Sequence, residues 1–315
     1  MCLHTGSSRP QARAPIRLAL SVALYLLTLI ASGPLYAAEP LEIRLPVRES
    51  EFEDVRACQL NPDSACRSCL ADHSSSASLV IYSILQEALT AGGIKAKVRA
   101  IPSPNSERSR KMVSDGLADV KSDWEFNIDP YPDLLKSAPI LRKGEFEKGV
   151  YVSPDTLALR SDAPISDLHD MQAVSIRTWR LDWEALENLV PKSLASAPTT
   201  FQIYSLINAG RADFTLLEFS SEPDLTRRNE DVTLYPMPGV KVILPGSQHF
   251  MISRRLPGAQ NFLKALDHGL TTLRQSGFIR QCLVNSGIIN EKVADWKILN
   301  PMAAQTNGTA TLPLH

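Results

Sequence analysis

Residues 206–218 read LINAGRADFTLLE, and this stretch decides the fold. Residues 201–209 have the apolar spacing of a helix, which Gly210 ends. The apolar run 213–217 then predicts a buried strand, with Glu218 at its carboxyl end. A helix that leads directly into a buried strand is typical of α/β proteins with parallel strands. We therefore expect an α/β unit around this stretch.

Strands and helices alternate from this stretch toward both ends of the chain. In the first half, the periodicity predicts strands at 41–48, 94–101 and 117–122 and helices at 74–89 and 106–114. In the second half, it predicts strands at 149–152, 156–159, 173–176, 240–244 and 250–253 and helices at 182–190 and 258–277. Residues 49–73 and 127–149 are expected to be loops.

The first 38 residues have the pattern of an export signal. Arg9, Arg13 and Arg17 precede the apolar run 18–31, no acidic residue occurs before it, and small residues follow at Ala37 and Ala38. This pattern predicts a cleavable secretory signal that is cut near Ala37 or Ala38. A membrane anchor is the alternative, but spanning a bilayer takes about 20 apolar residues and this run is shorter. We therefore expect a periplasmic mature protein that does not span the membrane.

Composition excludes some classes of partner. The chain has 33 basic and 34 acidic residues, and loss of the signal removes three arginines, so no basic surface for nucleic acid is expected. A mature chain of about 277 residues exceeds the usual single core, which favours two lobes.

Four cysteines remain after cleavage, namely Cys58, Cys66, Cys69 and Cys282. An even number in an oxidising compartment predicts two disulfides, with three possible connectivities. A redox or metal site at Cys66 and Cys69 is the alternative. The second Cys/His pair of a zinc site is missing, so we expect no metal and no cofactor.

Several landmarks occur in a fixed order along the mature chain. They are Gly116-Leu-Ala-Asp119, Ser137-Ala-Pro-Ile140 leading into Gly149-Val-Tyr-Val152, residues 165–171 (ISDLHDM), residues 206–213 (LINAGRAD) and residues 273–277 (LRQSG). In this order the chain resembles the type II periplasmic solute-binding proteins of family 3, the soluble receptors of amino-acid importers and related sensors, of which it would be a divergent member.

The resemblance implies a two-lobed α/β fold with mixed sheets, helices on both faces and a two-strand hinge. Lobe 1 would comprise residues 39–152 and 246–302, lobe 2 residues 153–245, and residues 303–315 would be a flexible tail. A ligand would lie between the lobes, beyond the carboxyl ends of the strands, where helix N-termini offer unpaired donors.

Two positions decide which ligand the resemblance implies. Amino-acid receptors of this family usually carry an arginine just before the Ser-x-Pro segment, whereas residues 123–136 contain none and Lys136 cannot supply its bidentate geometry. The amine-binding acid of the family falls at Glu218. An acid-rich cleft without that arginine favours a neutral or cationic ligand over a standard α-amino acid.

The candidate ligand-binding residues stand where predicted strands end. They are Glu49, Ser50, Asp123, Trp124, Arg177, Thr178, Trp179 and Glu218. Five of them have a structural alternative: a solvated strand end for Glu218, core packing for Trp124 and an ordinary turn for residues 177–179.

The sequence therefore predicts a monomeric periplasmic binding protein rather than an enzyme. It would capture a small polar solute and present it to an inner-membrane permease of the ABC type or to a sensor. An accessory protein of a periplasmic redox enzyme complex and a dehydratase-like enzyme on the same fold are the alternatives. No histidine lies in a pattern that indicates a nucleophile and its base.

Overall fold

The computed structural model describes residues 40–60, 77–160 and 167–300. The chain divides into two compact units, Met1–Pro40 and Leu41–His315, and the fold below is that of the second unit. The predicted signal, the predicted tail, Cys66 and Cys69 lie outside the described residues.

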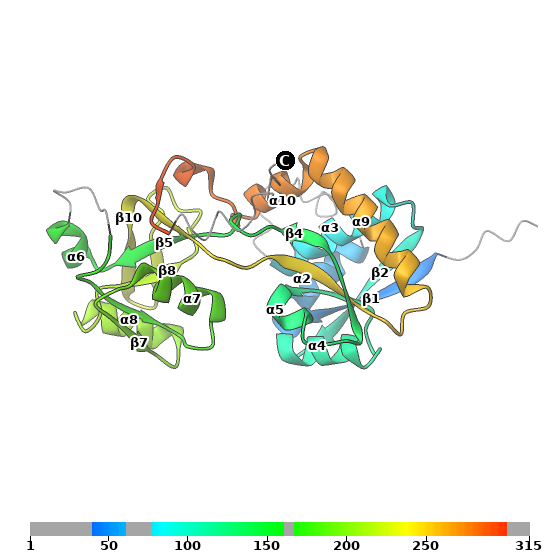
Figure 1. The fold of residues 1–315 in the computed structure, drawn as a ribbon, viewed down its shortest axis with the longest axis horizontal. Coiled ribbons are helices and arrows are strands. Elements are labelled where there is room, and N and C mark those ends of the chain that lie inside the picture. Colours follow the sequence, from blue (N-terminus) through cyan, green and yellow to red (C-terminus); the bar gives the residue numbers. More distant parts are fainter. Residues whose placement is uncertain (1–39, 61–76, 161–166, 301–315) are drawn as a thin grey trace, which may run out of the picture. The chain divides into compact units, whose positions relative to one another are not determined.

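Helices and strands alternate along the second unit (Figure 1). The described helices are, in chain order, α2 (Glu49–Leu60), α3 (Ala77–Ala91), α4 (Ser106–Ser114), α5 (Glu125–Ile128), α6 (Pro154–Leu159), α7 (Arg180–Leu189), α8 (Thr200–Asn208), α9 (Ala259–Gln275), α10 (Phe278–Asn285) and the 3₁₀ turn η2 (Glu291–Val293). The described strands are β1 (Leu41–Arg48), β2 (Ala96–Ser103), β3 (Val120–Trp124), β4 (Leu134–Leu141), β5 (Glu147–Val152), β6 (Gln172–Ser175), β7 (Ser193–Ser196), β8 (Phe214–Leu217), β9 (Arg227–Asn229), β10 (Val232–Ile243), β11 (Gln248–Ser253) and β12 (Lys297–Ile298).

The strands form two groups, which define the two lobes. In the first lobe β1 pairs with β2 in parallel, and β11 lies between β3 and β4 in an antiparallel sheet. In the second lobe the order is β12-β10-β5-β8-β6-β7, with β9 paired to β10. β6 is parallel to β7 and β8, whereas β5 is antiparallel to β8 and β10. The predicted α/β class with mixed sheets is therefore confirmed.

Two segments of chain connect the lobes. One runs from β4 to β5 through residues 142–146, and the other runs from β10 to β11 through residues 244–247. These two crossings are the two-strand hinge expected from the resemblance. Because β5 pairs with β8 and β10, the first crossing lies before Glu147 rather than at residue 152.

Both Gly-x-x-Asp segments fix a strand in the same way. Asp119 donates its backbone N–H to the carbonyl of Arg44 at 2.9 Å, and its carboxylate accepts the N–H of Arg44 at 2.7 Å. Asp213 makes the same two bonds to Gln172, each 2.7 Å long. The buried carboxylate of Asp119 also pairs with the guanidinium of Arg44 at 2.6 Å. Each aspartate thus attaches the segment before one strand to a neighbouring strand.

Some predicted elements are wrong, for local reasons. Residues 156–159 belong to helix α6 rather than to a strand, because Ser153 caps the helix through the N–H of Thr156 and Pro154 occupies the first turn. Residues 49–60 form helix α2 rather than a loop, and β4 runs through the predicted loop 127–149.

Helices α3 and α9 lie side by side in the first lobe, α3 in cyan and α9 in orange (Figure 1). They meet at two glycines. A Cβ on Gly269 would lie 1.8 Å from the carbonyl oxygen of Ala88, and one on Gly92 would lie 2.1 Å from that of Ala265. Only glycine permits the two backbones to approach this closely.

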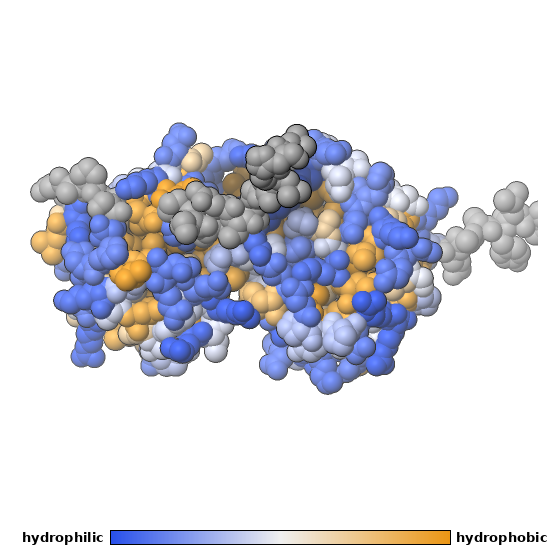
Figure 2. Space-filling view, viewed as in Figure 1, coloured by the Kyte–Doolittle hydropathy of each residue, from blue (hydrophilic) through white to orange (hydrophobic). Residues whose placement is uncertain are grey.

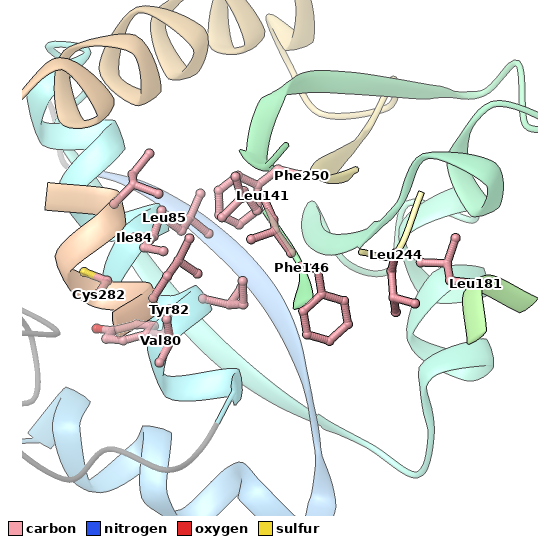
Figure 3. Packing of buried hydrophobic residues seen from close by; sticks show 14 of the residues in the cluster. Val80, Tyr82, Ile84, Leu85, Leu141, Phe146, Leu181, Leu244, Phe250 and Cys282 are labelled. Carbon is pink, nitrogen blue, oxygen red and sulfur yellow. The ribbon is translucent and has the colours of Figure 1, made fainter. Parts of the chain in front are cut away.

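The largest apolar core is continuous from one lobe to the other (Figure 3). In the first lobe it packs side chains of α3 against the sheet residues Leu141 and Phe250. Phe146 and Leu244, on the two crossings, extend it toward Leu181 of α7. The hinge is thus lined with buried apolar residues rather than with solvated loop.

Two of the four cysteines, Cys58 and Cys282, lie within the described residues. Cys58 on α2 is disulfide-bonded, and Cys282 on α10 is completely buried in the core of the first lobe (Figure 3). The pairing of the four cysteines therefore stays a prediction.

The surface is mainly polar. Figure 2 shows hydrophilic residues over most of one face, with apolar residues in small separate groups. Within the described residues, no helix combines the length and the apolar character that crossing a membrane requires.

Candidate functional site

A cavity of about 490 Å³ opens where the ends of several elements from both lobes converge. α4, β3, α5, the two crossings, β5, the start of α7 and the end of β8 all contribute to it. Its lining residues are Arg110, Trp124, Phe126, Asn127, Phe146, Lys148, Thr178, Trp179, Arg180, Leu181, Asp182, Glu218 and Leu244. We call this cavity the cleft.

The turn between β6 and α7, together with the first turn of α7, brings three polar side chains to the cleft: Thr178, Arg180 and Asp182. β6 ends at Ser175, and α7 begins at Arg180. Thr178 and Arg180 are exposed, whereas Asp182, in the first turn of α7, is buried. A carboxylate in the first turn of a helix is stabilised by the positive end of the helix dipole. The first turn of α7 therefore brings one basic residue, Arg180, and one acidic residue, Asp182, to the cleft.

Aromatic rings form the walls. The ring centroids of Trp124 and Phe146 are 5.6 Å apart, in a tilted arrangement. The guanidinium of Arg180 lies over the ring of Phe126, 4.6 Å from its centroid, so a residue of α7 contacts a residue of α5. Stacked rings of this kind offer a flat apolar surface to a planar or apolar part of a ligand.

A buried ion pair lines the cleft. The ammonium of Lys148 is 2.6 Å from Oδ1 of Asp182, and each side chain is 9% exposed. The same ammonium lies 5.7 Å from the ring centroids of both Phe146 and Trp179. Burial is the largest influence on Asp182 and raises its pKa above the ordinary value. The repulsion of Glu218 raises this pKa further, whereas the attraction of Lys148 lowers it without cancelling the effect of burial.

Two charged side chains of the cleft, Arg180 and Glu218, take part in none of the ion pairs of the described residues. Within residues 40–60, 77–160 and 167–300, neither the guanidinium of Arg180 nor the carboxylate of Glu218 makes a hydrogen bond or an ion pair. One can take a negative group and the other a positive group without first losing a partner.

A second cavity of about 340 Å³ adjoins the cleft and shares Arg110, Trp124 and Asn127 with it. Asp123 is buried there and accepts hydrogen bonds from Lys121 at 2.9 Å and from Asn127 at 2.8 Å. Burial by itself would raise the pKa of Asp123, but Lys121 and Asn127 hold it below its ordinary value.

Hydrogen bonds attach the crossings to the first lobe. The carboxylate of Glu125 pairs with Lys143 on the first crossing at 2.8 Å, and its backbone N–H donates to the carbonyl of Ser247 on the second at 2.9 Å. The hydroxyl of Ser247 lies 2.8 Å from Nε2 of His249, and Nδ1 of His249 lies 2.7 Å from the carbonyl oxygen of Ser137. Because a carbonyl oxygen only accepts, Nδ1 carries the proton.

The structure brings half of the predicted ligand residues together in the cleft. Trp124, Thr178, Trp179 and Glu218 line it, and Asp123 lines the adjoining cavity. Glu49 and Ser50 begin α2 with exposed side chains and line neither cavity. Arg177 lies over the ring of Trp183, 4.7 Å from its centroid, outside the cleft. The ligand-binding roles of all eight residues stay predictions.

Sequence reasoning missed the other charged residues of the cleft. Arg110, Lys148 and Arg180 are basic, whereas Asp182 and Glu218 are acidic. The expectation of an acid-rich cleft is therefore wrong, because Arg110 and Lys148 reach it from a helix and a hinge strand that give no functional signal in the sequence. Within the described residues, no group of three or more His, Cys, Asp or Glu residues is placed to hold a metal ion.

The chain is similar to three solved structures at low sequence identity. The probable amino-acid ABC transporter extracellular-binding protein ytmK from Bacillus subtilis is 11% identical, with 78% of this chain and 97% of that chain covered and a TM-score of 0.51. The VFT2 domain of BvgS from Bordetella pertussis is 12% identical, with 81% of this chain and 95% of that chain covered and a TM-score of 0.47. The second substrate binding domain of a putative amino acid ABC transporter from Streptococcus pneumoniae is 10% identical, with 78% of this chain and 99% of that chain covered and a TM-score of 0.46.

The similarity to ytmK confirms the two-lobed periplasmic-binding-protein-like fold expected from the sequence landmarks. At 11% identity it establishes the fold alone. No protein-family model matches the chain, and no curated protein matches it in sequence.

Proposed function

We propose that this chain is an extracytoplasmic solute-binding protein that holds a small polar solute in the cleft. The observation that carries the proposal is the composition of the cleft. Aromatic side chains line it together with Arg180 and Glu218, two charged groups that have no ion-pair partner in the described part of the chain. A pocket with apolar walls and few convergent polar groups is the usual form of a small-molecule site.

The positions of the charges favour a dipolar solute. The guanidinium of Arg180 would hold a carboxylate or another anionic group, and Glu218 would hold an ammonium or another donor. Thr178 adds a hydroxyl beside Arg180. A solute with one group of each kind would neutralise both residues as the lobes close around it.

The structural relatives support a role in transport. ytmK is a probable amino-acid ABC transporter extracellular-binding protein, and by analogy this chain would present its solute to an inner-membrane permease or to a sensor. The proposal includes export by residues 1–38, a periplasmic location and a monomeric mature form. The lobes would be those expected from the sequence, 39–152 plus 246–302 and 153–245, except that strand β5 (Glu147–Val152) goes with lobe 2 because it pairs with β8 and β10.

Thermal denaturation tests the proposal. A solute that binds only the folded protein raises the free energy of unfolding by about 2.7 kcal/mol at a concentration of 100 Kd. We expect a set of amino acids, small amines, organic acids and sugars to contain one that raises Tm in a concentration-dependent manner. The protein should first be unfolded and refolded to remove any copurified solute, which mass spectrometry of the released fraction would identify. A complete lack of both signals would refute the proposal.

Two substitutions then test the site. Arg180→Gln and Glu218→Gln remove one charge each and should weaken solute binding at least tenfold, or about 1.4 kcal/mol. Arg211→Gln and Glu184→Gln are matched controls, since both residues are exposed and neither lines the cleft. Equal effects of the control and cleft substitutions would show that the solute binds elsewhere.

A further inference from the structure

The surroundings of the Lys148 ammonium resemble a site for a cationic ligand. A carboxylate oxygen of Asp182 lies 2.6 Å away, and the rings of Phe146 and Trp179 lie 5.7 Å away at their centroids. A carboxylate combined with aromatic faces is the arrangement by which proteins recognise ammonium groups. Here the ammonium belongs to the protein itself.

These groups belong to the cleft rather than to a closed core. Lys148, Asp182, Phe146 and Trp179 all line the same cavity of about 490 Å³. Lys148 reaches it from hinge strand β5, whereas Asp182 and Trp179 come from the first turn of α7 and its N-cap. An ammonium that arrived in the cleft on a solute would therefore meet Asp182 only if Lys148 were absent.

Stability alone does not account for this pair. Removing two charges from water costs several kcal/mol per ion, and an apolar pair of similar volume often stabilises a protein as well or better. The raised pKa of Asp182 shows that its burial is not fully offset by Lys148. An ion pair that lines a cleft instead affects which solutes can enter.

We propose that Lys148 is a specificity-determining residue that fills the cation subsite formed by Asp182, Phe146 and Trp179, and that it thereby excludes solutes with a cationic group at this position. The biological meaning rests on the proposed function, because exclusion matters only if the cleft binds a solute. The group that a solute directs to this position is then uncharged or anionic, and its cationic group, where it has one, goes to Glu218.

Chemical rescue tests the proposal without knowledge of the natural solute. Lys148→Ala removes three carbons and the ammonium, which are the atoms of n-propylammonium. We expect n-propylammonium chloride to raise the Tm of Lys148→Ala by about 2 °C or more at high concentration, and to leave the Tm of the unsubstituted protein unchanged relative to sodium chloride. n-Propanol has nearly the same shape without the charge and should have no such effect.

The control variant is Lys148→Ala/Asp182→Asn, in which the subsite lacks its carboxylate. It should lose the response to n-propylammonium, whereas Lys148→Ala/Glu184→Gln should keep it, because Glu184 is an exposed acid of the same helix outside the cleft. If Lys148→Ala does not fold, Lys148→Met keeps an unbranched apolar stem, removes only the ammonium group and leaves Asp182 available to the smaller ammonium ion.

The outcomes separate this inference from the proposed function. No response of the folded Lys148 variants, or an equal response of the unsubstituted protein, would overturn the inference even if a natural solute binds. A specific response would support it, even if the solute screen failed and the proposed function were rejected.

Discussion

At the scale of single residues, His249 links the hinge to the pH of the surroundings. Its ring is buried, and burial lowers its pKa below the ordinary value of 6.5, although the bond to the Ser137 carbonyl partly opposes this. Charges from several elements act on the ring: Lys136 disfavours its protonated form, whereas Glu125, Asp129 and Asp267 favour that form. The neutral ring accepts a hydrogen bond from Ser247, beside the second crossing.

The sign of the pH effect follows from this lowered pKa. The unfolded chain binds a proton at His249 near pH 6.5, whereas the folded protein binds it only at lower pH. The contribution of His249 to stability is therefore complete above about pH 6.5 and decreases as the pH falls below that value. It stops decreasing once the pH lies below the folded-state pKa.

His249→Asn tests this effect, because the asparagine amide can donate to Ser137 as Nδ1 does but does not titrate. We expect the Tm of the unsubstituted protein to fall more steeply between pH 7 and pH 5 than that of His249→Asn. His268→Asn is the matched control, since His268 is exposed on α9. Parallel curves for the protein and His249→Asn would contradict the assignment.

At the scale of elements, the pattern of side chains predicted most of the fold correctly. β1 and α4 have the predicted limits, and β8 differs by one residue, because Ile43, Leu45 and Val47 alternate on a buried face and Asn105 caps α4. Periodicity failed where a cap decides the element, as at α6, where Ser153 and Pro154 begin a helix.

The candidate site could be predicted only in part, for a related reason. Trp124 and Glu218 end strands, and strand ends converge at one edge of a sheet. Lys148 lies inside strand β5, and Asp182 lies inside helix α7. Their 2.6 Å contact depends on how that strand and that helix meet, which no local pattern encodes.

The close contact between helices α3 and α9 reverses the usual effect of one substitution. Replacing a helical glycine by alanine normally stabilises a helix, but at this contact we expect it to destabilise the protein. Alanine in place of an exposed helical glycine gains about 0.5–1 kcal/mol. At Gly269, however, the new Cβ would lie 1.8 Å from the carbonyl oxygen of Ala88. The two backbones must then separate, and we expect Gly269→Ala to lower the free energy of unfolding by about 3 kcal/mol.

Chemical denaturation of Gly269→Ala measures this loss. His268→Ala is the adjacent control, since its side chain is exposed, and it should change stability by less than about 0.5 kcal/mol. An unchanged denaturation midpoint for Gly269→Ala would show that the helices do not approach as described.

At the scale of the whole second unit, the proposed solute site and the hinge meet at Gly246. This residue lies on the second crossing, and a Cβ there would be 2.7 Å from Cδ1 of Leu181 on α7 and 3.2 Å from Cε3 of Trp124 on β3. Leu181 and Trp124 both line the cleft, one from each lobe. A side chain at Gly246 would therefore separate two walls of the cleft.

We expect Gly246→Ala to weaken solute binding about tenfold, because the leucine methyl groups can move only partly out of the way. Leu181→Ala removes those methyl groups, so the double variant should bind more tightly than the sum of the two single effects predicts. The measurement is a double-mutant cycle on the solute Kd, together with Tm in the absence of solute to separate binding from folding. If the effects of the two substitutions on the free energy of binding were strictly additive, Gly246 would not act through Leu181. The close approach of Gly246 to Leu181 would then not determine how tightly the cleft binds its solute.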